Sequence, residues 1–211
     1  MPDLEKNYKM NKALAKIFTV LFHPLLLPSI GIIILYNSGS VLEYLPFQAK
    51  KVILLVVSVS TLILPLTFVP FFIFQRIIKD VQMENKKERF IPFFVTAVLY
   101  FFGYYLLLRL GAPQTISKFI LASATTVSVL FLLSFKWKVS AHMTGLGGMT
   151  GALIAISFRL GVNLEYYIIA AILISGIVAY SRLLLKAHKQ LHIYLGWFAG
   201  LIVNLLVLFL F

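Results

Sequence analysis

Long apolar blocks are the feature of this sequence that most limits its fold. Each is close to the ~20 residues that a helix needs to cross ~30 Å of hydrocarbon. The seven blocks cover residues 17–36, 52–74, 92–110, 115–135, 142–160, 164–184 and 191–211. In a medium without water, such segments satisfy their backbone N–H and C=O groups as helices. We therefore expect an all-α, polytopic transmembrane helix bundle with six core helices and one extra N-terminal span.

The expected domain organisation follows from these blocks. Residues 1–16 are polar and carry four lysines, which predicts a basic juxtamembrane arm. Residues 17–211 are expected to form a single transmembrane domain with its core at about 52–211. Two prolines inside the first block predict a kink there. His23, which precedes the first of these prolines, is interpreted as a packing residue.

Composition excludes several classes of function. The chain of 211 residues is 61% hydrophobic and contains no cysteine, which rules out disulfides, thiolate chemistry and cysteine-based metal sites. Its formal net charge is +12, but the lysines and arginines lie in short connections between apolar blocks. That placement is typical of membrane topology and of contact with anionic headgroups, and not of nucleic-acid binding. Membrane lipids are the expected partners.

Three polar islands interrupt the apolar sequence, at residues 84–89, 136–142 and 181–192. Seven spans would place all three on one membrane face, together with the N-terminus. That face carries 14 lysines and arginines, and the opposite face carries 5. The positive-inside rule therefore predicts that the shared face is cytoplasmic. We expect an integral protein of a plasma membrane, of the bacterial inner-membrane kind.

The islands contain residue types that bind and transfer phosphate. Arg89 and Arg182 are permanent cations whose planar donors match phosphate oxygens. Ser140 lies just before a predicted helix N-terminus, which is itself an anion-binding element. His142 and His188 titrate near neutral pH. Together they fit phosphoryl transfer through a phosphohistidine, in which one imidazole attacks phosphorus and the other protonates the leaving oxygen.

The spacing of these residues resembles three signatures of a known family. The pattern Ser-Arg-x5-His-x3-His at 181–192, followed by two glycines, is similar to Ser-Arg-x5-His-x3-Asp. Val-Ser-Ala-His at 139–142 resembles Pro-Ser-Gly-His, and Glu-Arg-Phe-Ile-Pro at 88–92 loosely resembles Lys-x6-Arg-Pro. These are the signatures of the type-2 phosphatidic acid phosphatase superfamily of membrane-integral lipid phosphatases. The resemblance spans about residues 79–200.

The resemblance implies a metal-independent hydrolase without a cofactor. His188 would attack phosphorus, and His142 would protonate the leaving group and later activate water. The phosphate would be held by residues of the three motifs, namely Arg182, Arg89, Ser140, Lys86 and Ser181. The implied substrate is a phosphomonoester or pyrophosphate on a lipid, of the phosphatidic acid, phosphatidylglycerol phosphate or polyprenyl pyrophosphate class.

One position departs from the family pattern. His192 stands where the family has the Asp that orients the nucleophilic histidine. A neutral His192 is expected to accept a hydrogen bond from His188 Nδ1 instead. Alternatively, Glu84 or Glu88 takes the place of the aspartate. The departure leaves open an alternative function, a non-catalytic protein that binds or transports anionic lipid. The i, i+4 spacing of His188 and His192 also leaves open a metal site.

Overall fold

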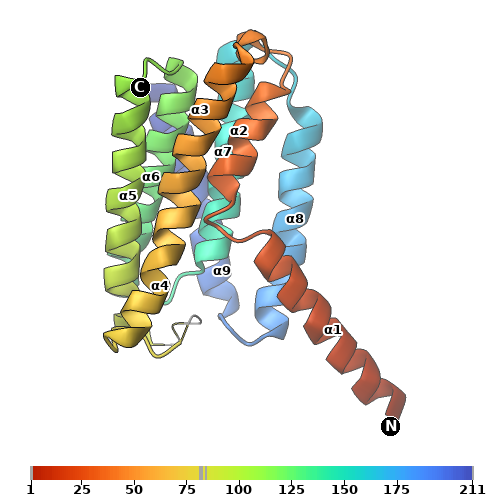
Figure 1. Cartoon of the computed structure of the whole chain (residues 1–211). Helices are drawn as coiled ribbons and strands as arrows, with labels where there is room; N and C mark the ends of the chain where they lie inside the picture. The colour runs from red at the N-terminus through yellow and green to blue at the C-terminus, as the bar shows by residue number, and fades with distance from the viewer. Residues whose placement is uncertain (1, 81–82, 84, 211) are drawn as a thin grey trace.

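Among the residues that the structure describes, six helices are long and apolar enough to cross a membrane, which confirms the predicted all-α transmembrane bundle. The computed structural model describes residues 2–80, 83 and 85–210, and over these residues it contains helices and loops without strands (Figure 1). The six spans are Phe47–Phe74, Lys87–Arg109, Gln114–Ser134, Ala141–Leu160, Glu165–Leu184 and Gln190–Leu210. They contain α3 (Phe47–Ser58) with α4 (Leu64–Phe74), α5 (Phe90–Arg109), α6 (Gln114–Ser134), α7 (Ala141–Leu160), α8 (Glu165–Leu184) and α9 (Gln190–Leu210).

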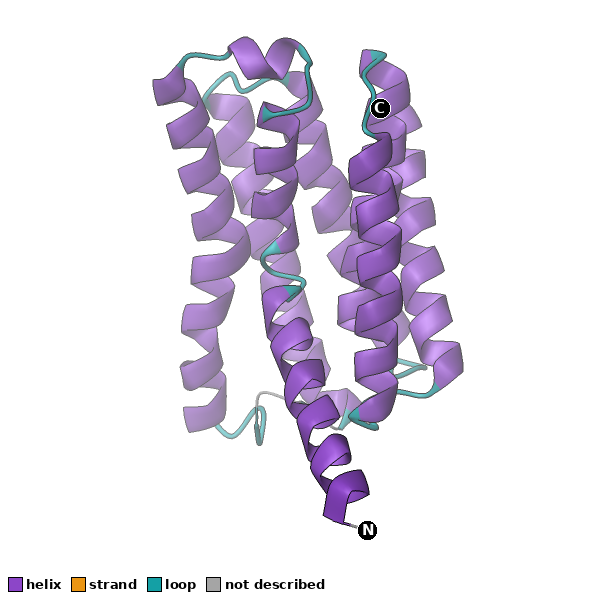
Figure 2. Cartoon of the chain, turned by 90° about the vertical axis from the view of Figure 1, so that its right-hand side faces the viewer, coloured by secondary structure: helices purple, strands orange, loops and turns teal. Residues whose placement is uncertain are grey.

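The N-terminal region differs from the predicted kinked span over 17–36. It forms two helices, α1 (Pro2–Leu21) and α2 (Leu27–Tyr36), separated by a break at residues 22–26. The ten residues of α2 rise about 15 Å, half of the hydrocarbon thickness. An extra N-terminal span is therefore not confirmed. Figures 1 and 2 show α1 running obliquely away from the bundle, beyond the end at which the α8–α9 connection lies.

The first long span accommodates its prolines by changing its helical geometry. A π-helical turn at Val59–Ile63 separates α3 from α4, and Pro65 follows in the first turn of α4. The hydroxyls of Ser60 and Thr61 donate to carbonyls one turn earlier, including that of Val57 at 3.3 and 2.8 Å. Pro65 has no N–H to donate to a carbonyl one turn earlier, and the π turn lies just before it. The span thus continues through the prolines as the sequence predicts.

Helix α7 is the centre of the bundle. In the most apolar 18-residue stretch of α7, 67% is buried inside the protein, against at most 44% in the corresponding stretch of any other span. Its glycines allow α9 to pack directly on its backbone. A Cβ on Gly147 would clash with the carbonyl of Trp197, and a Cβ on Gly200 would clash with the carbonyl of Thr144. Small residues drive such close helix contact in lipid, where apolar burial gives little advantage.

The connections between α4 and α5, α6 and α7, and α8 and α9 lie at one end of the bundle (Figure 1). We call this the basic end. The first helical residues of α7 and α9 lie there, together with the last residues of α8. The close α7–α9 contact therefore fixes the relative positions of two of the three predicted motifs.

We expect Gly147→Ala to lower the free energy of unfolding by about 1–3 kcal/mol, as overpacking of a tight contact does. Gly176→Ala is the matched control, because a Cβ at Gly176 in α8 meets nothing within 4 Å. That control should be neutral or slightly stabilising, since alanine is the better helix former. Thermal unfolding in detergent measures both. Equal effects of the two substitutions would contradict the close α7–α9 contact.

Candidate functional site

The backbone of residues 138–140, between α6 and α7, joins the three polar islands. Arg89 donates from Nη1 to the carbonyl of Val139 at 3.0 Å. His188 Nδ1 lies 3.0 Å from the carbonyl of Lys138. The N–H of Ser140 donates to the carbonyl of His192 at 3.2 Å. The structure therefore brings the three motifs together at the basic end, as their sequence positions predict.

Arg89 is held by two backbone carbonyls of the described residues. Its side chain is only 5% exposed, and its Nε donates to the carbonyl of Met83 at 3.0 Å. With the bond to Val139, it connects the segment before α5 to the segment before α7. A guanidinium has five N–H groups, so further donors remain after these two bonds.

Two buried polar atoms in the motifs have no hydrogen-bond partner among the described residues. They are Nε of Arg182, in the last turn of α8, and Oγ of Ser140, the N-cap residue of α7. Ser140 does not use its hydroxyl to cap its own helix. A buried unpaired polar group costs about 1–3 kcal/mol. Each of the two groups can donate to an anionic oxygen, and so can the N–H groups of the first turn of α7.

His188 is held as a neutral imidazole in a defined tautomer. A carbonyl only accepts, so the contact with Lys138 places the proton on Nδ1 and leaves a lone pair on Nε2. Burial, followed by the positive charges of Arg89 and Arg182, lowers the pKa of His188 to about 3. At neutral pH the Nε2 lone pair is therefore available for reaction with an electrophile.

His142, in the first turn of α7, is held by the N-terminal segment. Its Nε2 lies 3.1 Å from the carbonyl of Thr19, so Nε2 carries the proton and Nδ1 is the remaining nitrogen. The ring of His23 stands at 86° to that of His142, with centroids 5.3 Å apart. His23 thus lies in the cluster. Its sequence context, an apolar block far from the motifs, carries no signal of this contact.

Electrostatic interactions indicate that the cluster has a common centre. The charge of Arg182 acts on Arg89, His23, His142 and His188. Among the described residues, the charges that act on His188 are those of Arg89, Arg182 and Lys138, all of them positive. A group of cations with unpaired donors attracts an anion.

His192 has a different place from the one expected. Its backbone carbonyl binds Ser140, but the acceptor at Nδ1 of His188 is the Lys138 carbonyl and not the His192 ring. His188 precedes α9, whereas His192 lies in its first turn, so the two do not share a helix face. Among the described residues, no group of three His, Cys, Asp or Glu side chains is arranged to hold a metal ion.

The remaining predicted residues are placed less centrally. Ser181 is buried, and its hydroxyl donates to the carbonyl of Ile177 at 2.8 Å, so its proton is not available to a phosphate oxygen. Glu88 accepts from the N–H of Lys79 at 3.5 Å, within its own connection, and does not contact His188. Glu84 and the side chain of Lys86 lie outside the described residues.

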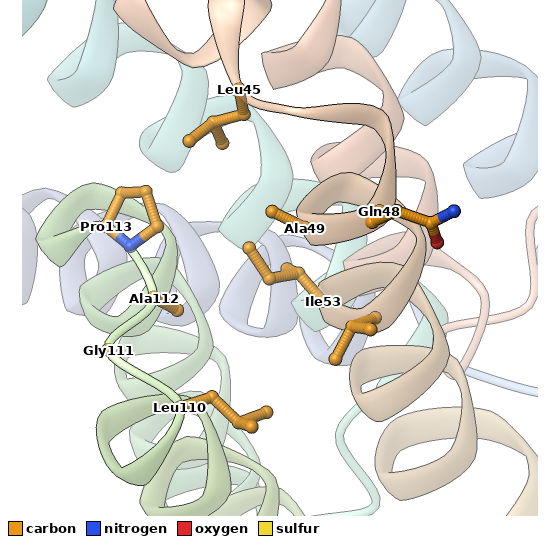
Figure 3. A pocket seen from close by; sticks show the side chains of 9 residues that line it. Leu45, Gln48, Ala49, Ile53, Leu110, Gly111, Ala112 and Pro113 are labelled. Carbon is orange, nitrogen blue, oxygen red and sulfur yellow. The ribbon is translucent and has the colours of Figure 1, made fainter.

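A separate pocket lies near the opposite end of the bundle, beside the start of α3 and the α5–α6 turn (Figure 3). Its volume is ≈ 390 Å³, and its lining is Leu45, Gln48, Ala49, Val52, Ile53, Leu110, Gly111, Ala112 and Pro113. This lining contains no ionisable side chain. The pocket suits an apolar group, and no residue of the three motifs lines it.

We expect folding stability to fall as the pH is lowered from 7 to 5. The unfolded chain takes up a proton on His188 below its ordinary pKa of 6.5, while the folded protein does not until pH approaches 3. This difference amounts to about 2 kcal/mol at pH 5. His188→Asn, which keeps an N–H donor for the Lys138 carbonyl, should lose correspondingly less. Equal pH dependence of thermal unfolding in the two proteins would show that His188 is not held neutral.

Comparisons with known proteins leave the cluster to be interpreted from its own geometry. No family model, no curated protein and no solved structure matches this chain. The resemblance to the type-2 phosphatidic acid phosphatases therefore rests on the three short motifs. The motif residues that meet at the basic end are Arg89, Ser140, His142, Arg182 and His188.

Proposed function

We propose that this integral membrane protein is a metal-independent phosphatase that hydrolyses a phosphomonoester or pyrophosphate on a lipid. The observation that carries the proposal is the state of His188, a neutral imidazole with its Nε2 lone pair free in a field of positive charge. The unpaired Nε of Arg182 and Oγ of Ser140 supply donors for the phosphate oxygens. A nucleophile, anion-binding groups and a second histidine are the parts that phosphoryl transfer requires.

In the first step, Nε2 of His188 attacks phosphorus and the bond from phosphorus to the leaving oxygen breaks. The bound anion favours a second proton on His142 at Nδ1, the nitrogen not bound to Thr19, and His142 gives this proton to the leaving oxygen. Arg182, Arg89 and the N-terminus of α7 stabilise the charge on the equatorial oxygens. His188 keeps its Nδ1 proton on the Lys138 carbonyl throughout.

In the second step, water attacks the phosphohistidine and the bond from Nε2 to phosphorus breaks. Neutral His142 accepts the proton of the attacking water at Nδ1 and so returns to its protonated form. Inorganic phosphate leaves, and His188 regains its lone pair. The two steps need no metal and no redox partner. His142 acts first as an acid and then as a base.

The Lys138 carbonyl takes over part of the role that an aspartate has in the family signature. It fixes the ring and tautomer of His188, which is the orienting function of such an acid. It carries no full charge, so the arginine-bound phosphate itself supplies the negative charge of the reacting complex. A dianionic monoester or a pyrophosphate fits this requirement better than a monoanionic diester.

The position of the cluster favours a lipid substrate. The cluster lies at the end of membrane-spanning helices, close to where headgroups of a bilayer would be. Phosphatidic acid, phosphatidylglycerol phosphate and polyprenyl pyrophosphates are the classes we propose. The excess of lysine and arginine at this end favours a cytoplasmic face of a bacterial inner membrane.

One observation favours the alternative, a non-catalytic protein that binds or transports anionic lipid. In the part of the chain that the structure describes, the charges acting on His188 include no carboxylate, and its hydrogen-bond acceptor is a backbone carbonyl. Such a site can hold an anion without turning it over.

Phosphate release in detergent decides between the two functions. We expect the wild type to release phosphate from short-chain phosphatidic acid or an isoprenyl pyrophosphate. His188→Asn should lose at least about 10³-fold, since it removes the nucleophile, and His142→Ala about 10²-fold or more for loss of general acid–base catalysis. Wild-type rates equal to those of His188→Asn on every substrate would leave only the binding function.

Arg182→Gln should separate stability from phosphate binding. Without phosphate, this variant should be as stable as the wild type or more so. It removes a buried unpaired Nε–H group and also a positive charge that repels Arg89. Inorganic phosphate should raise the unfolding temperature of the wild type and much less that of the variant. Arg109→Gln is the control, because Arg109 is exposed on α5 and contacts Tyr105. Equal phosphate stabilisation of both variants would remove Arg182 from the site.

A further inference from the structure

The end of α1 and the break that follows it contact His142 from outside the six-helix core. The Thr19 carbonyl, at the end of α1, lies 3.1 Å from Nε2 of His142. Four residues later, the His23 ring stands edge-on to the same imidazole at a centroid distance of 5.3 Å. Two groups of one segment therefore act on the ring to which the proposed reaction assigns proton transfer.

The local sequence fixes this segment in place. Proline follows His23, which disfavours helix at His23 and ends α1 there. The N–H of Leu25 approaches Nδ1 of His23 at 3.4 Å, which leaves the His23 proton on Nε2. Gly145, one turn after the start of α7, lets the break approach closely, because a Cβ there would lie 3.2 Å from Cβ of Pro24 and 2.9 Å from Leu27.

The orientation of the His142 ring decides whether Nδ1 faces the reaction. A half-turn about the Cβ–Cγ bond would exchange Nδ1 with Cδ2 and Nε2 with Cε1, so that neither nitrogen would keep its place. The Thr19 carbonyl favours the orientation in which it receives the Nε2 proton. The perpendicular ring of His23 fills the space beside the imidazole and opposes the turn.

We infer that His23 is a positioning residue of the proposed phosphatase reaction, which holds His142 so that Nδ1 remains the nitrogen for proton transfer. This inference rests on the proposed function. It makes the break at residues 22–26 a part of the site, and it predicts that the break matters most for the steps in which His142 gives or takes a proton.

Leaving-group dependence tests this role. We would compare the wild type, His23→Ala, His23→Phe and Leu21→Ala on short-chain phosphatidic acid and on p-nitrophenyl phosphate. The alkoxide that leaves phosphatidic acid needs a proton, whereas p-nitrophenolate leaves without one. Leu21 is the matched control, because it lies in the same segment but is 55% exposed.

We expect His23→Ala to lower kcat on phosphatidic acid about 10- to 100-fold with little change in KM. This loss is a fraction of what general acid–base catalysis contributes in full. With p-nitrophenyl phosphate, the first turnover should stay fast and phosphohistidine should accumulate, because its hydrolysis still needs His142 as a base. His23→Phe should restore most of the rate, since it keeps an aromatic edge beside His142. Leu21→Ala should resemble the wild type.

Three results would overturn the inference. The first is equal loss on both substrates without accumulation of phosphohistidine, which indicates a general folding role. The second is a rate of His23→Ala equal to that of Leu21→Ala. The third is failure of His23→Phe to restore the rate despite wild-type thermal stability, which would show that His23 acts through its proton. Failure of the proposed function is distinct from these, because the wild type would then match His188→Asn on phosphatidic acid.

Discussion

The hydrogen bonds of the backbone at residues 138–140 are the interactions on which the rest of the site depends. The carbonyls of Lys138 and Val139 bind His188 and Arg89, and the N–H of Ser140 binds the carbonyl of His192. These groups lie outside the helices, at the end of a membrane bundle, so they need partners that the helices cannot supply. The same bonds therefore close the basic end of the fold and set the positions of the proposed nucleophile and of one phosphate-binding arginine.

The unpaired donor of Arg182 lowers the stability of the cluster, and in the proposed function it binds an anion. Arg89 satisfies part of its hydrogen-bonding capacity with backbone carbonyls, whereas Arg182 keeps its Nε buried and unpaired near another cation. Residues that break the rule of paired buried polar groups are concentrated at functional sites. The positive field has a second effect, because it holds His188 neutral and so keeps its lone pair available at neutral pH.

The N-terminal region contacts the cluster although its sequence carries no motif. The sequence predicts one kinked span, but His23 and the proline after it end α1 at the depth of His142. Gly145 provides the close approach that seats this break against α7. The contact of Thr19 and His23 with His142 joins α1 and the break to the six-helix core at the one place where the proposed chemistry needs a fixed ring.

The sequence by itself determined the all-α membrane bundle, the six long spans and the common end of the three motifs. These follow from block length and from the alternation of spans, which are local properties. Only the tertiary structure decided that the Lys138 carbonyl, and not His192 or Glu88, binds His188 Nδ1, and that His23 lies beside His142. The physical reason is that every residue carries the same backbone carbonyl. Which carbonyl meets a given side chain depends on how distant helices pack, here through the glycines of α7 and α9.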